Sequence, residues 1–505
     1  MNKKIFFTLS VVLLSFNVSH SRDEYSQIHD LITTWQITRA RSLMDELQEV
    51  PPFLKGLYEF YIGNYKAALN YFEESPRETE EWITRCRDTL ETAKNFQEMN
   101  TGYFTIRYTG KDEVLALYLK DMMDKIALRG YEKFGWKPDD RRIILEIYPD
   151  RASFKKASTL TDEQIKVSGA IGICKFNRLM VASPRVLLFG YNWPRTITHE
   201  YIHLIVGKIT GLKNMPLWFN EGLAKLYENL GGIYGEQYST ELSPVAKNYL
   251  IEARRRESNW VNLDKMKYGM PTLDSSEEVK LGFAQVHSMT EYIRKNYGKD
   301  SIKKLLYLLK EKKEKEAFLT GIGTTPEEIF EKWKEYIKDA PIDYTPGATL
   351  SGYLFDDEKE DTVGRYIAYR AETDISLARR FEQRGNYNLS IRKYKDALSK
   401  DEGNHIIYNR LGRVKVKAGK LKEAKESLLK AIHRNPDYPP PYLHLGEIFF
   451  NKGKYKWGEN KLLQYIYISP FNPGSHELLV KIYGQTGEKE KRKRERKILK
   501  ILDED

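Results

Sequence analysis

The sequence predicts an α+β protein that is mostly α, with a small strand-rich region near its middle and a helical solenoid at its carboxy-terminal end. Three observations predict this fold class. Glycine returns every 34 residues in the last third, at positions 385, 419, 453 and 487, as in stacked helical repeats. Residues 194–210 carry apolar side chains at helical spacing, whereas residues 169–174 and 179–182 alternate like strands. A chain of 505 residues is too long for one core, so we expect about three domains.

The first 21 residues are typical of an export signal. Two lysines precede an apolar run at residues 5–16, and small residues stand before a predicted cut after Ser21. The run is too short to span a bilayer comfortably, and no other stretch is long and apolar enough. We therefore expect a mature protein that is periplasmic or secreted and has no transmembrane span. An uncleaved signal anchor is the alternative.

Residues 22–97 predict a helical, repeat-like region ahead of the central domain. Residues 30–47 have the pattern of an amphipathic helix. Residues 54–57, followed by Gly63 and Phe72, match one unit of the 34-residue pattern. One or two degenerate repeats are expected here.

The five residues from His199 to His203, HEYIH, carry the strongest functional signal. Positions four apart lie on one face of a helix, so both imidazoles can bind one metal ion, with Glu200 beside it. Two nitrogen ligands and a carboxylate that accepts a proton from water are what a zinc hydrolase needs. Pro194 and Gly211 suit the start and the end of this helix. The motif also arises by chance in unrelated chains, so the surrounding sequence has to support a metal site.

A third ligand is expected from the next helix, because catalytic zinc has three protein ligands and one open position. Glu221 stands 18 residues after His203, in an otherwise apolar stretch at residues 215–224. A carboxylate in such a stretch needs a cation as partner. Small residues such as Gly222 would let this helix approach the first one closely. Glu228, on the same face, is the reserve candidate, and an exposed Glu221 on an amphipathic helix is the alternative.

The HEYIH helix and the WFNEGLA stretch at residues 218–224 resemble the gluzincin clan of metallopeptidases. Within this clan, residues 98–340 are similar to the peptidase-MA-like domain of exported proteins. The resemblance implies a zincin-like fold with a small mixed sheet that includes strands at 104–108 and 143–148. It also implies that His199, His203 and Glu221 bind one zinc ion per chain. Glu200 would be the catalytic general base.

A pattern with a third histidine, found in other zinc peptidases, is disfavoured. Val206 and Ile209 stand where its glycine and its histidine would be.

The resemblance also implies a donor that stabilises the oxyanion of the tetrahedral intermediate. The clan commonly uses a tyrosine or histidine downstream of the third ligand, and His287 is the residue that we favour as a further catalytic residue. Tyr227 and Tyr268 stay open, and a purely structural role for His287 is the alternative. By analogy, the strand region at 169–182 would be the sheet edge along which an extended peptide substrate lies.

Residues 341–370 predict a linker, since they contain Pro341, Pro346 and several glycines, followed by an acidic cluster at 356–361. The linker would let the region that follows swing or dock against the central domain.

Residues 371–505 repeat one pattern of small and large apolar residues around the in-phase glycines. This pattern closely resembles the tetratricopeptide repeat, a helix–turn–helix unit of 34 residues. The resemblance implies an α-solenoid that binds a protein partner. The charged residues 488–497 are expected to be its polar cap, with a membrane or nucleic-acid patch as the alternative.

Composition narrows the class of function. The formal net charge is +11, but charges of both signs are interspersed and no nucleic-acid-binding motif is present, so we expect no nucleic-acid partner. Only Cys86 and Cys174 occur, which excludes a disulfide framework, although the two can in principle pair.

Two functions fit the sequence. The first is an exported zinc metallopeptidase that hydrolyses peptide bonds and whose repeats bind a peptide or protein substrate or a partner protein. The second is a non-catalytic, repeat-based scaffold with a degenerate protease domain. The intact set of two histidines and two glutamates favours the enzyme, because a degenerate relative is expected to have lost at least one of them.

Overall fold

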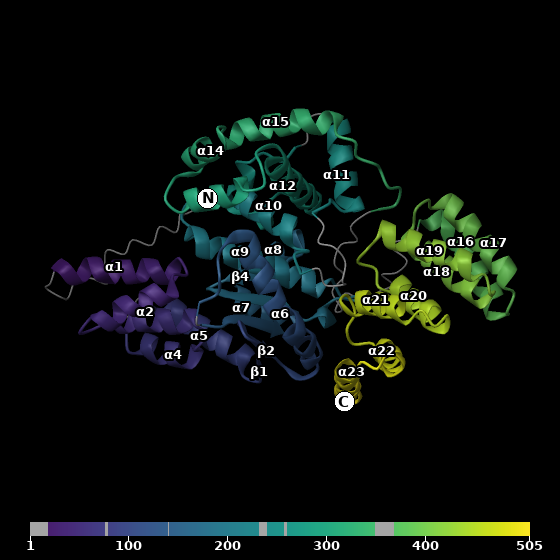
Figure 1. Ribbon diagram of the computed structural model, residues 1–505, viewed down its shortest axis with the longest axis horizontal. Coiled ribbons are helices and arrows are strands. Elements are labelled where there is room, and N and C mark those ends of the chain that lie inside the picture. Colours follow the sequence, from purple (N-terminus) through teal and green to yellow (C-terminus); the bar gives the residue numbers. More distant parts are fainter. Residues whose placement is uncertain are drawn as a thin grey trace.

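The computed structural model describes residues 19–75, 79–139, 141–231, 240–256, 260–348 and 368–504. Most of the predicted export signal, residues 1–18, lies outside the described residues, as do residues 349–367 of the predicted linker with its acidic cluster. The described part is mostly helical, with a five-stranded mixed sheet and a series of helix pairs at its carboxy-terminal end (Figure 1). The predicted fold class is confirmed.

The sheet has the order β1-β2-β3-β5-β4. Strands β2, β3 and β5 are parallel, while β1 and β4 run antiparallel to their neighbours at the two edges. Strands β3 and β5 are buried along their whole length, as expected for a sheet covered by helices, and in β2 every second residue is buried. The strands are β1 (Gln97–Asn100), β2 (Phe104–Tyr108), β3 (Ile143–Tyr148), β4 (Gly172–Lys175) and β5 (Arg178–Ala182).

Edge strand β4 begins at Gly172 rather than at residue 169, where the sequence places it. Gly169 instead caps helix α8 (Asp162–Ser168) in the left-handed conformation, with φ of 66°. Strand β4 returns as β5 through Phe176 and Asn177, which both have positive φ. Such a two-residue turn matches the twist of a hairpin.

Helices of the central region surround this sheet, and α9 packs directly on β4 and β5 (Figure 1). They are α6 (Glu113–Phe134), α7 (Arg151–Ser158), α8, α9 (Trp193–Thr210), α10 (Leu217–Tyr227), α11 (Pro244–Arg255), α12 (Ser276–Asn296), α13 (Ser301–Leu309), α14 (Glu314–Ile322) and α15 (Pro326–Asp339).

The amino-terminal helices lie against the central region on the side of the sheet hairpin (Figure 1). The aromatic ring of Phe176, at the β4–β5 turn, packs against Phe60, Tyr61 and Trp82. These helices are α1 (Ser19–Thr33), α2 (Ile37–Glu46), α3 (Pro52–Tyr61), α4 (Tyr65–Glu73) and α5 (Glu80–Ala93).

A buried charge cluster joins the amino-terminal helices to the sheet. Glu146 of β3 is fully buried, with Arg178 at 3.2 Å and Arg107 at 3.2 Å. The hydroxyl groups of Tyr148 and Tyr65 also donate hydrogen bonds to this carboxylate. Burial acts in the opposite direction, but the two arginines hold the pKa of Glu146 below its usual value. The buried carboxylate of Glu146 is therefore neutralised by two arginines and accepts hydrogen bonds from two regions of the chain.

The carboxy-terminal region consists of helix pairs consistent with tetratricopeptide-like repeats. The four in-phase glycines lie in the turns within the pairs and all have φ between 67° and 76°, a left-handed conformation that glycine adopts without steric cost. The pairs are α16 (Tyr369–Gln383) with α17 (Tyr387–Lys400), α18 (His405–Lys417) with α19 (Leu421–Arg434), α20 (Pro440–Asn451) with α21 (Tyr455–Ile466), and α22 (Pro473–Thr486) with α23 (Lys489–Asp503).

Helices α3 and α4 share this geometry. Gly63 turns between them with φ of 77°. A Cβ atom on Gly56 would lie 2.8 Å from the Phe72 ring, just as one on Gly412 would lie 2.7 Å from Leu428. Close helix contact at a small residue thus occurs in both parts of the chain.

The repeats are not independent of the central region. One continuous hydrophobic core extends from the amino-terminal helices through the sheet to the last helix pairs, where it includes Tyr467, Leu479 and Ile498. Residues of α16 to α18 form a separate cluster around Tyr394. The last pairs are therefore docked, while the first pair, α16 with α17, lies at the outer end of the array (Figure 1).

No helix within the described ranges has both the length and the apolar character needed to cross a bilayer. Cys86 and Cys174 are both free thiols.

Arg107 forms one ion pair with the buried Glu146 and another with the half-exposed Glu98, so the contributions of the two pairs to stability can be compared. Substituting Glu146→Gln leaves Arg178 and Arg107 without their buried counter-charge, so we expect the free energy of unfolding to fall by about 3–5 kcal/mol. The matched control is Glu98→Gln, since Glu98 also pairs with Arg107, at 2.8 Å, but is half exposed; there we expect a change of about 1 kcal/mol or less. Urea unfolding followed by circular dichroism measures both changes, and equal effects would contradict the role of the buried cluster.

Candidate metal centre

Helix α9 forms where the sequence predicts it. The Asn192 side chain caps its first turn by accepting a hydrogen bond from the Arg195 N–H at 3.2 Å, and Pro194 occupies that turn. Gly211 ends the helix with φ of 65°. The apolar positions Ile197, Tyr201, Leu204 and Ile205 are fully buried, which fixes the orientation of the helix and leaves the face with His199 and His203 toward α10.

Helix α10 carries Glu221 toward α9, although the close approach expected at Gly222 is made to another helix. A Cβ atom on Gly222 would lie 2.0 Å from Thr290 Oγ1 and 2.7 Å from the carbonyl oxygen of Val286, both on α12. The expectation that Gly222 brings α10 close to α9 is therefore wrong. Gly222 instead lets α12 support α10 from behind, with Glu221 left on the side of the histidines.

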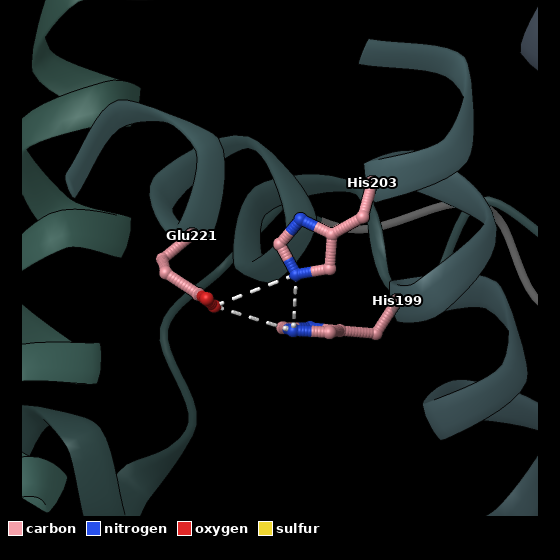
Figure 2. A group of neighbouring side chains, drawn as sticks. All are labelled: His199, His203 and Glu221. Carbon is pink, nitrogen blue, oxygen red and sulfur yellow. Dashed lines mark hydrogen bonds and ion pairs between the residues drawn. The ribbon is translucent and has the colours of Figure 1, made fainter. Parts of the chain in front are cut away.

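Three donor atoms converge between α9 and α10 (Figure 2). His199 Nε2 and His203 Nε2 lie 3.2 Å apart, and each lies 3.5 Å from Glu221 Oε2. Tetrahedral ligands at zinc distances of about 2.1 Å are separated from one another by about 3.4 Å. The spacing and the chemistry of this donor set therefore fit a zinc ion with three protein ligands.

The outer nitrogens of both imidazoles have partners that fix the rings. His203 Nδ1 lies 2.9 Å from Asn220 Oδ1, and His199 Nδ1 lies 3.3 Å from Glu228 Oε2. Because a carboxylate only accepts hydrogen bonds, Nδ1 of His199 donates the hydrogen bond to Glu228. In a neutral ring the Nε2 lone pair is then directed toward Glu221 and is available to a metal.

Glu228, the reserve candidate for a metal ligand, thus contacts the far nitrogen of His199. Its carboxylate also pairs with Lys225 at 2.8 Å and with Arg195 at 3.7 Å. Burial opposes ionisation, but Lys225, the bond to His199 and Arg195 together hold the pKa of Glu228 well below its usual value. Glu228 is therefore ionised and orients His199.

The charges of the three converging residues support one another. Burial disfavours the charged form of His199, but hydrogen bonds to Glu221 and Glu228 outweigh it and raise the pKa of His199 to about 9. Burial likewise opposes ionisation of Glu221, but the two histidines hold the pKa of this carboxyl well below its usual value. The site thus attracts positive charge, which protons or a metal ion can supply.

Glu200 lies against edge strand β4. It is 7% exposed, and burial, the largest effect, raises the pKa of its carboxyl group. The backbone N–H of Cys174 donates a hydrogen bond to this carboxylate. A Cβ atom on Gly172 would lie 3.0 Å from Glu200 Oε1 and 2.8 Å from Thr196 Cγ2, so only glycine leaves room for Glu200 in this place. A buried carboxyl with a raised pKa suits a general base that works near neutral pH.

None of the residues predicted as oxyanion donors belongs to the converging set. His287 of α12 is buried, and its Nε2 lies 2.9 Å from the carbonyl oxygen of Thr240. Burial lowers the pKa of His287. Tyr227 is buried against Phe134, whereas Tyr268 is 81% exposed at the end of the short helix η4 (Lys265–Tyr268). The role of His287 in oxyanion stabilisation stays a prediction.

Sequence reasoning missed the residues that orient the ligands. Asn220 directly precedes Glu221, and Arg195 lies one turn before His199 on the same helix face. Gly172 carries no signal in the sequence, because its role depends on the approach of Glu200 from another element.

Comparison with known proteins identifies a peptidase family for the part of the chain that contains the three converging residues. A family model described as the peptidase MA superfamily matches residues 140–339. No curated protein matches the sequence significantly. Among solved structures, the chain is similar to the APC/C hetero-tetramer Cut9–Hcn1, with 11% identity, a TM-score of 0.24 and coverage of 95% of this chain and 74% of the other. It is also similar to yeast LTA4 hydrolase in complex with bestatin, with 10% identity, a TM-score of 0.28 and coverage of 81% and 67%.

The range that the family model matches contains the converging histidines and glutamate, whereas the two structural similarities are too distant to indicate a family. Residues 140–339 of this chain are therefore a domain of the peptidase MA superfamily.

Proposed function

We propose that this chain is a zinc-dependent metallopeptidase whose repeats bind its substrate or a partner protein. The observation that carries the proposal is the convergence of His199, His203 and Glu221, at spacings that match a zinc site, inside a peptidase MA domain. A degenerate domain that serves only as a scaffold has no physical reason to keep three largely buried, mutually oriented ligands.

His199, His203 and Glu221 would hold the metal, with Glu228 and Asn220 keeping the two imidazoles in place. A bound zinc ion supplies Lewis acidity, which polarises a carbonyl group and lowers the pKa of a water molecule. Glu200 would accept a proton from the attacking water and pass it to the leaving amine. Its burial supports this role, because a carboxyl with a raised pKa can both take up and release a proton.

Strand β4 is the proposed place for an extended peptide. In the described residues it pairs with β5 along one side only, and at Cys174 its N–H points to Glu200. An extended substrate that continued the sheet along the free side would gain backbone hydrogen bonds, and its scissile bond would lie near Glu200. Recognition through the backbone depends little on the side chains of the substrate.

We expect Glu200→Gln to abolish peptide cleavage while zinc stays bound, because the amide keeps the shape of the carboxylate but cannot accept the proton. The expected loss in kcat is about 10²- to 10⁴-fold. Cleavage of a peptide library and the zinc content of the purified protein are the two measurements. Glu163→Gln, an exposed position of α8, serves as control and should leave cleavage unchanged. A wild-type protein that holds zinc but cleaves nothing in a broad library would favour the scaffold function.

Removing the metal should lower stability, since an ion that binds only the folded protein stabilises it. At a free zinc concentration of 100 times Kd, the gain is about 2.7 kcal/mol. We therefore expect a chelator to lower the Tm of the wild type and added zinc to restore it. Glu221→Ala should show no zinc-dependent shift, and Mg²⁺, which prefers oxygen ligands, should have no effect on the wild type. A Tm that is independent of zinc would contradict the metal site.

Export through residues 1–21 is part of the proposal and is supported by the sequence of this segment alone. Mass spectrometry of the protein isolated from its native cells should find a mature chain that begins at Arg22. A chain that retains Met1 in the cytoplasm would contradict export.

A further inference from the structure

The repeat array is hydrogen-bonded to the amino-terminal end of α9, the helix that carries both histidines. The loop after α21 accepts hydrogen bonds from the segment that leads into α9: Tyr191 N–H donates to Ile468 O at 3.2 Å, and Trp193 N–H donates to Tyr467 O at 3.1 Å. The indole N–H of Trp193 also donates to Ile466 O at 3.1 Å. A Cβ atom on Gly190 would lie 2.0 Å from the Ile468 carbonyl oxygen, so the two backbones approach as closely as glycine permits.

A second contact from the repeats reaches α9 itself. Asp437 lies in the loop between α19 and α20, and its Oδ2 accepts a hydrogen bond from Arg195 Nη2 at 2.7 Å. Both side chains are more than two-thirds buried. The neighbouring Tyr438 packs edge-on against Phe189 at 5.7 Å between ring centroids, which holds the loop in place.

Arg195 stands between this loop and the metal ligands. Its guanidinium lies 3.7 Å from Glu228 Oε1, and Glu228 Oε2 lies 3.3 Å from Nδ1 of His199. Lys225 is the other cation on Glu228, at 2.8 Å, and comes from the same helix as Glu221. Lys225 therefore anchors Glu228 within α10, while Arg195 ties it to α9 and to the repeats.

We propose that Asp437 and Arg195 are positioning residues for His199, so that the docked repeat array is a part of the metal centre. The inference rests on the proposed metal site. Asp437 fixes the Arg195 side chain, and Arg195 adds a positive charge beside Glu228 Oε1, which also accepts a hydrogen bond from Lys225 at 3.0 Å. Glu228 in turn orients the imidazole. Without Asp437, Arg195 loses its hydrogen bond to the repeat loop, so its guanidinium is held less firmly beside the Glu228 carboxylate.

The coupling is reciprocal, because two linked equilibria affect each other equally. If docking of the Asp437 loop favours metal binding, then bound metal favours docking by the same factor. A partner that pulled the repeats away from α9 would thereby weaken the metal site, and zinc would oppose that movement.

The test is the zinc affinity of the purified full chain, measured by competition with a chromophoric chelator. Outer partners of metal ligands change metal affinity by about 10- to 100-fold, which is the expected loss for Glu228→Gln. Asp437 acts on Glu228 only through Arg195, so we expect a smaller effect: Asp437→Asn should weaken zinc binding about 3- to 10-fold. Asp437→Glu, which keeps the charge, should restore most of the affinity.

The matched control is Asp121→Asn. Asp121 of α6 forms an equally short ion pair, 2.6 Å, with Arg494 of α23 across the same docking interface, but it has no link to the metal ligands. Its removal should change zinc affinity by less than about twofold. In an Arg195→Met background, Asp437→Asn should cause no further loss, because residues in one chain of contacts are not additive.

Hydrogen exchange gives a readout that does not depend on affinity. Zinc should slow amide exchange in the loop at residues 435–439 of the wild type and should not do so in Arg195→Met. Equal zinc affinity of Asp437→Asn and wild type, or equal losses in Asp437→Asn and Asp121→Asn, would overturn the inference while the metal site stands. A wild type that binds no zinc would overturn the proposed function as well.

Discussion

Three carboxylates and two imidazoles gather at the junction of α9 and α10, and their need for compensating charge organises the surrounding structure. Glu221 and Glu228 are held ionised by the histidines, by Lys225 and by Arg195. Glu200 is the exception, since burial raises its pKa and no lysine or arginine within the described residues is paired with it. Buried charges of this kind persist only where partners and hydrogen bonds are supplied from several directions. The elements that supply them are distributed over most of the chain.

Helix α9 receives support on each side that it buries. Strands β4 and β5 lie along one face, with Gly172 leaving room for Glu200. The repeats hold its first turn through Trp193 and Arg195. At the other end, Lys208 donates a hydrogen bond to the carbonyl oxygen of Trp35, from the amino-terminal helices. The helix that carries both histidines is therefore fixed by all three regions of the molecule.

Buried carboxylates also join the amino-terminal and carboxy-terminal regions to the central region. Glu146 of β3 pairs with Arg107 of β2 and Arg178 of β5 and accepts a hydrogen bond from Tyr65 of the amino-terminal helices. Glu495 of the last helix is buried against Tyr118 of α6 and His476 of α22. In both places a carboxylate without solvent exposure is satisfied by groups from more than one region. Such contacts favour a defined docking geometry over a swinging one, because separation would leave charges unpaired.

The sequence by itself determined the elements and the first set of site residues. Helical spacing brought His199 and His203 to one face, the apolar surroundings of Glu221 pointed to a buried cation, and the 34-residue glycine period predicted the helix pairs. These features are local, so they are visible along one segment. Only the tertiary structure decided that Gly222 faces α12, that Glu228 orients His199 and that Asp437 reaches Arg195. Each of these depends on the approach of segments distant in sequence, and the direction of a side chain across such a contact is set by packing, which no local pattern records.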